Sequence, residues 1–346
     1  MAENMMDDSV SKRKMEHIET LLADKGADRR KGYFKDILLK HHALPEIALA
    51  DVDTSVEFLG KSLSMPFLIS SMTGGSGDTL SRINRNLAVA AERAGVAMGV
   101  GSQRVMFREK TARRSFELRE QAPRTVLLAN LGAVQLNCGF GVAECREAVE
   151  ILDADGLIFH LNPLQEVCQR EGDTNFAGLA EKIGTVAAEL DVPVLVKEVG
   201  AGICGEDVER LLRNGVEIID VAGTGGVSWS RVECSRSSAE ERERKLYEDW
   251  GIPTPRALRL MQPYLERIDL IASGGLRSGL DMAKAMAMGA HMCGMARPLL
   301  EPAMDSAEAV VSVIERVREE FRKALFLLGC PTVEALKGRE DLILTQ

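Results

Sequence analysis

The feature that most constrains the fold of this chain is an alternation of short apolar runs with amphipathic segments, repeated eight times from residue 66 onward. Apolar runs of about four to eight residues predict buried strands, and longer segments with apolar residues at helical spacing predict helices. Such repetition forces parallel strands, because each crossover returns the chain to the same edge of the sheet. Eight units predict one α/β domain with the (β/α)8 TIM barrel fold, and a doubly wound open sheet is the alternative.

The boundaries of these elements follow from the polar and glycine-rich residues that separate the apolar runs. The predicted strands, with their polar ends, are 66–75, 96–104, 125–133, 156–166, 192–200, 217–226, 268–279 and 290–300. The predicted helices are 80–95, 111–122, 141–154, 176–190, 205–215, 254–265, 280–289 and 306–329. Pro263 should end its helix early, because proline lacks the backbone N–H that a helix interior requires.

Three segments lie outside the alternation. Residues 44–63 carry short apolar patches that indicate a hairpin covering the bottom of the barrel. Residues 1–35 form a polar N-terminal extension. Residues 227–251 are a long polar insert after the sixth predicted strand, and a long loop at the C-terminal end of a strand favours a lid.

Composition excludes several classes of protein. A net charge of -9 disfavours broad binding to nucleic acid or to anionic membranes. The seven cysteines are odd in number and form no CxxC pair, which favours a reduced cytoplasmic protein over a disulfide or zinc framework. The N-terminus lacks the apolar core of a signal peptide, and no run approaches the roughly 18 apolar residues of a membrane span.

Polar residues follow the predicted strands, and in a parallel barrel all these ends meet at one mouth, where ligands bind. The residues at these ends with chemical potential are Met72, Thr73, Ser102, Arg104, Asn130, His160, Asn162, Gln165, Glu166, Lys197, Thr224, Gly275, Arg277 and Ala296. The turns at 273–279 and 294–298 are glycine-rich and occupy the slots where barrels often bind phosphate. Ordinary tight turns are the alternative, but two such turns with Arg277 favour a phosphate cradle.

Several of these residues also allow a purely structural interpretation. Lys197 lies on an apolar strand, so it either pairs with a neighbouring carboxylate or serves as a cation in the site. Glu166 either begins a helix or binds Mg²⁺ through its hard oxygen atoms, and the residues alone favour neither. His160 is either a satisfied core histidine or part of a polar pocket. Residues 13–18, RKMEHI, are either a solvated helical turn or an anion-binding arm that folds over a site.

The motifs together resemble a known family. In chain order they are RKMEH, SSMTGG, GSQR, ANLG, HLNPLQE, VKEVG, DVAGTGG, SGGLRSG and GMARP. This series is similar to that of the type 2 isopentenyl diphosphate isomerases, which are FMN-dependent (β/α)8 barrels. HLNPLQE and RKxEH are specific to that family, whereas the glycine turns occur in other FMN barrels. The match runs from about residue 13 to 345.

The resemblance implies interconversion of isopentenyl and dimethylallyl diphosphate by reduced FMN with Mg²⁺, NADPH supplying the electrons that reduce the flavin. It implies flavin contacts from Met72, Thr73, Ser102, Asn130, Lys197 and Thr224, with Gly275, Arg277 and Ala296 at the flavin phosphate. It implies substrate contacts from Arg13, Lys14, His17, Arg104, His160, Asn162 and Gln165, with Glu166 on Mg²⁺. It implies catalytic roles for Gln165, Glu233 and Lys197, and assembly as a homotetramer or homo-octamer. Relatives often carry Thr where this chain has Val227, so a hydroxyl is lost there. If that hydroxyl contacts the flavin in relatives, the contact is absent here or is supplied by Ser228.

Two competing functions are an FMN-dependent 2-hydroxy acid oxidase or dehydrogenase and a non-enzymatic interaction scaffold. The oxidase chemistry requires a histidine base with an arginine after strand six or seven, and residues 161–290 contain no histidine. A scaffold predicts a colourless protein without converging polar residues. An enzyme that uses a nucleophilic cysteine after strand six is also disfavoured, because Cys234 lies in a charged, glycine-poor segment.

Overall fold

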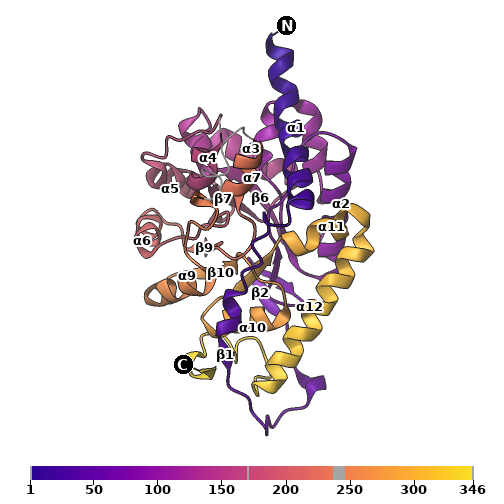
Figure 1. Cartoon of the computed structure of the whole chain (residues 1–346), viewed down its shortest axis with the longest axis vertical. Coiled ribbons are helices and arrows are strands. Elements are labelled where there is room, and N and C mark those ends of the chain that lie inside the picture. Colours follow the sequence, from indigo (N-terminus) through magenta and orange to yellow (C-terminus); the bar gives the residue numbers. More distant parts are fainter. Residues whose placement is uncertain (1, 170, 237–245, 345–346) are drawn as a thin grey trace.

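The computed structural model describes residues 2–169, 171–236 and 246–344, and it forms a closed barrel of eight parallel strands in the order β10-β11-β4-β5-β6-β7-β8-β9 (Figure 1). The barrel strands are β4 (Phe67–Ile69), β5 (Ala97–Gly99), β6 (Leu127–Gly132), β7 (Gly156–Leu161), β8 (Val194–Glu198), β9 (Ile218–Asp220), β10 (Asp269–Ser273) and β11 (Met292–Met295). All eight predicted strands are therefore present, and the TIM barrel prediction is confirmed.

Helices surround the barrel and bury their apolar faces against it (Figure 1). The α-helices are α1 (Ala2–Ala23), α2 (Asp78–Ala94), α3 (Val142–Leu152), α4 (Pro163–Cys168), α5 (Leu179–Glu189), α6 (Gly205–Arg213), α7 (Trp229–Arg236), α9 (Thr254–Met261), α10 (Gly279–Ala287), α11 (Arg297–Asp305) and α12 (Ala307–Leu327). Helix α9 ends at Met261, where the 3₁₀ turn η6 (Gln262–Tyr264) takes over, so the predicted effect of Pro263 is confirmed.

A hairpin plugs the bottom of the barrel, as predicted for residues 44–63. Strands β2 (Val56–Phe58) and β3 (Lys61–Leu63) pair antiparallel. Phe58 and Leu63 are buried in a cluster with inward-facing strand residues. The strand residues of this cluster include Leu68, Ala97, Leu128, Ile158, Leu195, Ile218, Ile271 and Met292. This apolar filling closes one end of the barrel, so only the C-terminal mouth remains open to ligands.

One predicted element is wrong, and another is too long. Residues 111–122 are not an α-helix: the 3₁₀ segment η4 (Lys110–Phe116) is followed by turns in which Leu118 N donates to Phe116 O. The side chain of Arg119 then donates to Ala122 O, so these backbone groups are satisfied without a helix. The predicted strand 290–300 ends at Met295, because Pro298 fits the first turn of helix α11.

The two segments expected at the mouth also contain helices. Helix α1 packs beside α7, the described start of the 227–251 insert, and residues 237–245 of that insert lie outside the described residues. Arg231 of α7 donates two hydrogen bonds to Asp24, at 2.8 and 3.0 Å, and one to Glu248 at 2.7 Å. These contacts fasten the end of α1 to both described flanks of the insert.

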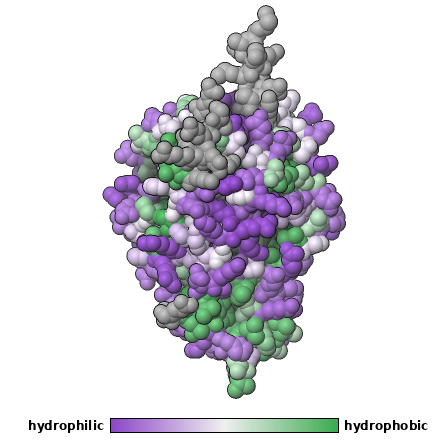
Figure 2. Space-filling model, viewed as in Figure 1, coloured by the Kyte–Doolittle hydropathy of each residue, from purple (hydrophilic) through white to green (hydrophobic). Residues whose placement is uncertain are grey.

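The pole opposite the start of α1 exposes several apolar side chains among polar ones. Figure 2 shows green surface gathered at this lower end, over β1 (Leu38–Leu39) and the end of α12. The exposed leucines of this end are Leu38, Leu44, Leu327 and Leu344. Contiguous exposed apolar surface on a folded protein commonly marks an interaction site. Within the described residues, no helix combines the length and hydropathy that crossing a membrane requires.

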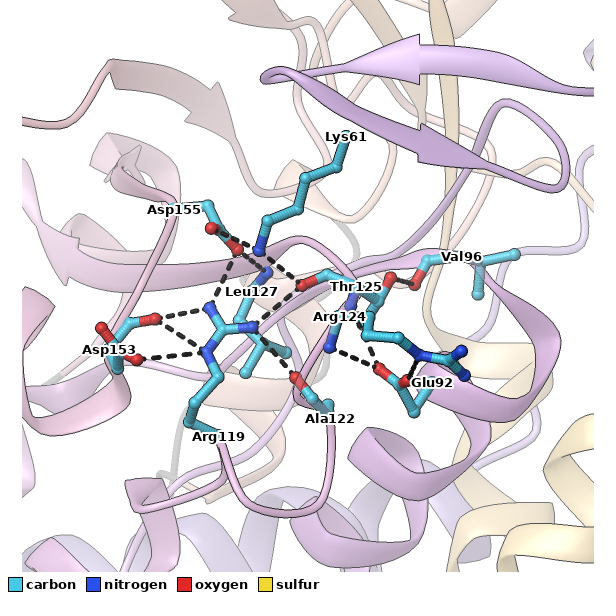
Figure 3. Close-up of polar contacts among 10 residues, drawn as sticks. All are labelled: Lys61, Glu92, Val96, Arg119, Ala122, Arg124, Thr125, Leu127, Asp153 and Asp155. Carbon is cyan, nitrogen blue, oxygen red and sulfur yellow. Dashed lines mark hydrogen bonds and ion pairs between the residues drawn. The ribbon is translucent and has the colours of Figure 1, made fainter.

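Arg119 ties the loops at the closed end together (Figure 3). Its guanidinium donates to the carbonyls of Asp153, Ala122 and Thr125 and to the Asp155 carboxylate at 2.9 Å. Asp155 also accepts from Leu127 N at 2.9 Å, so the network reaches the first residue of β6. The Arg119 side chain is only 19% exposed, so these bonds replace hydration rather than compete with it.

We expect Arg119→Met to lower the free energy of unfolding by about 2 kcal/mol, because one charged donor group serves several carbonyls. Arg124→Met is the matched control: Arg124 is 83% exposed and pairs with Glu92, so its loss should cost less than about 1 kcal/mol. Urea denaturation of both variants measures the difference. Equal stability of the two variants would contradict a structural role for Arg119.

Candidate active site

A large cavity lies at the C-terminal mouth of the barrel. Its empty space is about 1310 Å³ when the open solvent at its entrance is included, and residues at the ends of all eight strands line it together with residues of α1. The predicted residues among its lining are Lys14, His17, Met72, Thr73, Ser102, Asn130, His160, Gln165, Lys197, Gly275, Arg277 and Ala296. A smaller adjoining pocket adds Arg13, Arg104, Asn162 and Glu166. Thr224 is buried and lines neither space.

Glycine backbone forms one wall of the large cavity. Gly274 and Gly275 have φ angles of +95° and +85°, in a region that side chains disfavour. A Cβ on Gly275 would lie 2.7 Å from the Gly225 carbonyl carbon, so the turns after β9 and β10 pack backbone to backbone. Such exposed backbone can approach a phosphate closely. Ser70 Oγ, which is buried near this wall, has no hydrogen-bond partner among the described residues.

Arginine side chains flank this glycine wall. Arg277 pairs with the buried Asp28 of the N-terminal extension. Arg297 donates to Glu301 at 2.7 Å, and Nε of both Arg277 and Arg297 has no partner among the described residues. The free Nε groups and the close backbone fit a phosphate monoester such as that of FMN.

Lys197 projects from β8 into the large cavity, so the functional interpretation of this lysine fits its position. Its Nζ donates to the Glu198 carbonyl at 2.6 Å. Asp220, its register partner on β9, is buried, and its Oδ1 accepts from Ser273 at 2.7 Å. Burial raises the pKa of Asp220, while the charge of Lys197 opposes that rise. Lys197 is therefore the neighbour of the acid Asp220 on the next strand, and it also borders the large cavity.

His160 and Asn130 form a polar pair between the two spaces. His160 Nδ1 lies 2.7 Å from Asn130 Oδ1, and Asn130 Nδ2 donates to Ser71 Oγ at 2.7 Å. The amide oxygen therefore faces the ring and accepts from Nδ1–H, which leaves Nε2 as an acceptor. Burial and the cations Lys14, Lys197 and Arg104 lower the pKa of His160 to about 3, so the ring is neutral.

The short helix α4 positions the polar residues that follow β7. Pro163 begins it, and Asn162 is its N-cap residue. Asn162 Nδ2 donates to Glu166 Oε1 at 2.8 Å and lies 3.2 Å from Gln165 Oε1. Glu166 is thus in the first turn of a helix, and its carboxylate also borders the smaller pocket. Asn162 Oδ1 is buried without a partner among the described residues, so it and Glu166 offer hard oxygen atoms for Mg²⁺.

Glu233 of α7 joins three elements at the edge of the mouth. Its Oε1 accepts from Gln165 Nε2 at 2.8 Å and lies 3.1 Å from His17 Nε2, and its Oε2 accepts from Arg236 at 2.7 Å. Burial of the Glu233 side chain acts to raise its pKa, but the contacts with His17, Gln165 and Arg236 outweigh burial and lower the pKa to about 2. Glu233 is therefore ionised throughout the physiological range.

Cations gather where α1 crosses the smaller pocket. Arg13, Lys14 and Arg104 all border it, and Nε of both arginines has no partner among the described residues. Burial, and then the charge of Arg13, lowers the pKa of Lys14 to about 8. A recess bordered by three cations suits a diphosphate, so the anion-binding interpretation of residues 13–18 fits this geometry. Two of the cations also have acidic neighbours, Asp173 for Arg104 and Glu171 for Arg13.

The lost hydroxyl at Val227 is not replaced by its neighbour. Val227 lines the large cavity, whereas Ser228 does not. The Ser228 hydroxyl donates to Glu248 O at 2.8 Å and lies 3.1 Å from Ser230 Oγ. The cavity wall at this point is therefore apolar.

Sequence reasoning missed three polar residues at the mouth. Ser71 holds Asn130, Arg236 holds Glu233, and Asp173 pairs with Arg104 at 2.9 Å. Arg236 lies one helical turn after Glu233, a spacing that could have indicated an ion pair. Asp173 carries no comparable signal, because its partner lies far away in the sequence.

Comparisons with known proteins identify the family. Residues 6–138 and 142–343 match the family model described as FMN-dependent dehydrogenase. The isopentenyl-diphosphate delta-isomerase of Paracoccus zeaxanthinifaciens is 53% identical, covering 97% of this chain and 98% of that protein. The chain belongs to the isopentenyl-diphosphate delta-isomerase family. A second member, from Hydrogenovibrio crunogenus, is 49% identical over 98% of this chain and 99% of its own length. Membership in this FMN-dependent family supports FMN as the ligand of the glycine wall.

Solved structures show the same fold at low identity. A flavocytochrome b2 variant superposes with a TM-score of 0.66 at 18% identity, covering 93% of this chain and 80% of that chain. A mandelate oxidase variant with (S)-mandelic acid gives 0.62 at 19% identity, covering 92% and 88%. These likenesses support the barrel fold alone.

The depressed pKa of Glu233 predicts a pH-dependent stability. Its ionised form stabilises the folded state above the ordinary glutamate pKa of 4.5, and this contribution is lost as pH falls toward about 2. Glu233→Gln lacks the titration, so the stability advantage of the wild type over this variant should fall by roughly half between neutral pH and about pH 3. Urea denaturation at both pH values measures it. If the difference in free energy of unfolding between the wild type and Glu233→Gln did not change with pH, the assignment of an ionised Glu233 would be contradicted.

Proposed function

We propose that the chain interconverts isopentenyl diphosphate and dimethylallyl diphosphate by a 1,3-allylic proton shift. The observation that carries the proposal is the Gln165–Glu233 pair, which lies between a glycine wall suited to a flavin phosphate and a cationic recess suited to a diphosphate. Apolar residues that line the large cavity, including Val227 and Leu300, suit a short hydrocarbon chain. The names of the related proteins agree with this chemistry.

The reaction requires a proton added at C4 of an unactivated alkene and a proton removed from C2. Bound, reduced FMN supplies an electron-rich ring that stabilises positive charge and a nitrogen that exchanges a proton. Lys197 and the polar groups of Met72, Thr73, Ser102 and Asn130 would hold the flavin ring, with Thr224 behind them. Gly275, Arg277 and Ala296 would hold its phosphate. NADPH would reduce the flavin and be oxidised in that step, and the isomerisation itself would consume no NADPH.

The substrate diphosphate would bind Arg13, Lys14 and Arg104, with Mg²⁺ held by Glu166. Neutral His160 offers Nε2 as an acceptor, and Asn162 and His17 complete the polar lining. A carboxylate with a pKa of about 2 is poorly matched to accept a proton at neutral pH. Glu233 would therefore act by orienting the Gln165 amide over the alkene.

The proposal extends to the setting of the enzyme. We infer a cytoplasmic flavoprotein, because none of the seven cysteines, which all lie within the described residues, forms a disulfide. Assembly as a homotetramer or homo-octamer would use exposed apolar surface such as the lower pole in Figure 2.

Proton NMR of isopentenyl diphosphate with enzyme, FMN, Mg²⁺ and NADPH under anaerobic conditions tests the proposal. We expect the dimethylallyl isomer to accumulate to equilibrium without consumption of NADPH beyond flavin reduction. Absence of conversion by protein with reduced flavin would contradict it. Adding a 2-hydroxy acid such as mandelate to the oxidised protein tests the oxidase alternative, and we expect no bleaching of the flavin, because no histidine base follows strands six or seven.

Gln165→Ala should reduce turnover at least about a hundredfold while the flavin remains bound, because Gln165 contacts Glu233 but lies outside the glycine wall. The same NMR assay measures turnover, and the absorbance of the purified variant measures flavin content. Turnover equal to that of the wild type would remove Gln165 from the mechanism.

A further inference from the structure

Asp173 lies between the cationic recess and the proposed magnesium ligand. Its Oδ2 is 2.9 Å from Arg104 Nη1 and accepts from Gln135 Nε2 at 3.3 Å. Its backbone N–H donates to Glu166 Oε2 at 2.7 Å. A Cβ on the preceding Gly172 would overlap the Glu166 carbonyl oxygen, so the backbone is held tightly against the end of α4. One residue therefore contacts both a diphosphate-binding cation and the carboxylate expected to bind the metal.

The charge of Asp173 opposes the binding of an anion without a metal. A free diphosphate that binds the open Nε of Arg104 lies beside two negative groups, Asp173 and Glu166. A diphosphate that carries Mg²⁺ presents positive charge to these same groups. The side chains of Arg104 and Asp173 are 17% and 29% exposed, so solvent screens them only partly. The negative charge of Asp173 therefore acts on a ligand in the pocket.

We propose that Asp173 is a specificity-determining residue that makes diphosphate binding conditional on magnesium. It occupies Arg104 in the ligand-free protein and favours the magnesium complex over the free anion. The inference rests on the proposed function, because it takes the recess to be the diphosphate site. It goes beyond that function because it assigns part of the metal requirement to Asp173, in addition to Glu166.

The nearby Glu171 provides a matched control. Glu171 Oε1 lies 3.8 Å from Arg13 Nη1, and the Glu171 side chain is 57% exposed, so solvent and salt screen its charge. Asp173 and Glu171 thus come from the same segment and face neighbouring cations, but only Asp173 is close and shielded.

Calorimetric titration of the holoenzyme, in its oxidised form, with inorganic diphosphate tests the inference in EDTA and in excess MgCl₂. Oxidised flavin excludes turnover, so binding alone is measured. For Asp173→Asn we expect diphosphate to bind roughly three- to tenfold more tightly in EDTA. The ratio of the affinity in MgCl₂ to the affinity in EDTA should fall by the same factor. Glu171→Gln should change both values by less than about twofold. The backbone bond to Glu166 survives in Asp173→Asn, so the metal ligand should stay in place.

Asp173→Glu retains the charge and should keep the magnesium dependence, which separates loss of charge from altered packing. An unchanged magnesium gain in Asp173→Asn, or weaker binding of the free anion, would overturn the inference, as would a wild type that binds diphosphate equally well in EDTA and in MgCl₂. Wild-type protein that shows the expected magnesium dependence but converts no isopentenyl diphosphate would overturn the proposed function and leave the role of Asp173 standing.

Discussion

The open end of this barrel depends on one buried carboxylate. Glu233 accepts from Gln165 of α4 and Arg236 of its own helix, and it lies against His17 of α1. A buried carboxylate without these partners would cost several kcal/mol, so the three elements stabilise the charge and the charge holds the three elements together. Because α1 and α7 are not part of the barrel, this contact determines where the residues they carry meet the strand ends.

The barrel and the N-terminal helix α1 provide different binding regions. Glycine backbone after β9 and β10 creates a phosphate cradle that belongs to the barrel itself. The cations suited to a diphosphate come mainly from α1, with Arg104 following β5. Each binding region contains a cation that already pairs with an acid: Asp28 contacts Arg277 beside the glycine wall, and Asp173 contacts Arg104 in the cationic recess. These carboxylates partly neutralise the positive charge that the two pockets concentrate.

The periodicity of the chain was enough to predict the eight strands, the plug formed by residues 44–63 and the convergence of polar residues at one mouth. Local rules failed where side chains replaced helical hydrogen bonds, as Arg119 does near residues 111–122. Gln165 was predicted as a residue after the fourth strand, and Lys14 as part of a possible anion-binding arm. The contact of Gln165 with Glu233 of α7, however, is long-range and leaves no periodic signal. For the same reason Asp173 and Ser71 could not be found from sequence, since their partners are set by the closure of the barrel.

The central claim is that the barrel holds the flavin while α1 supplies the diphosphate site. A double variant, Arg13→Ala with Lys14→Ala, tests it most directly by comparing the affinities for FMN and for inorganic diphosphate with Mg²⁺. Loss of two charge-assisted contacts should weaken diphosphate binding by at least about a hundredfold, while FMN affinity stays within about twofold of the wild type. Unchanged diphosphate affinity, or a parallel loss of FMN, would contradict this division.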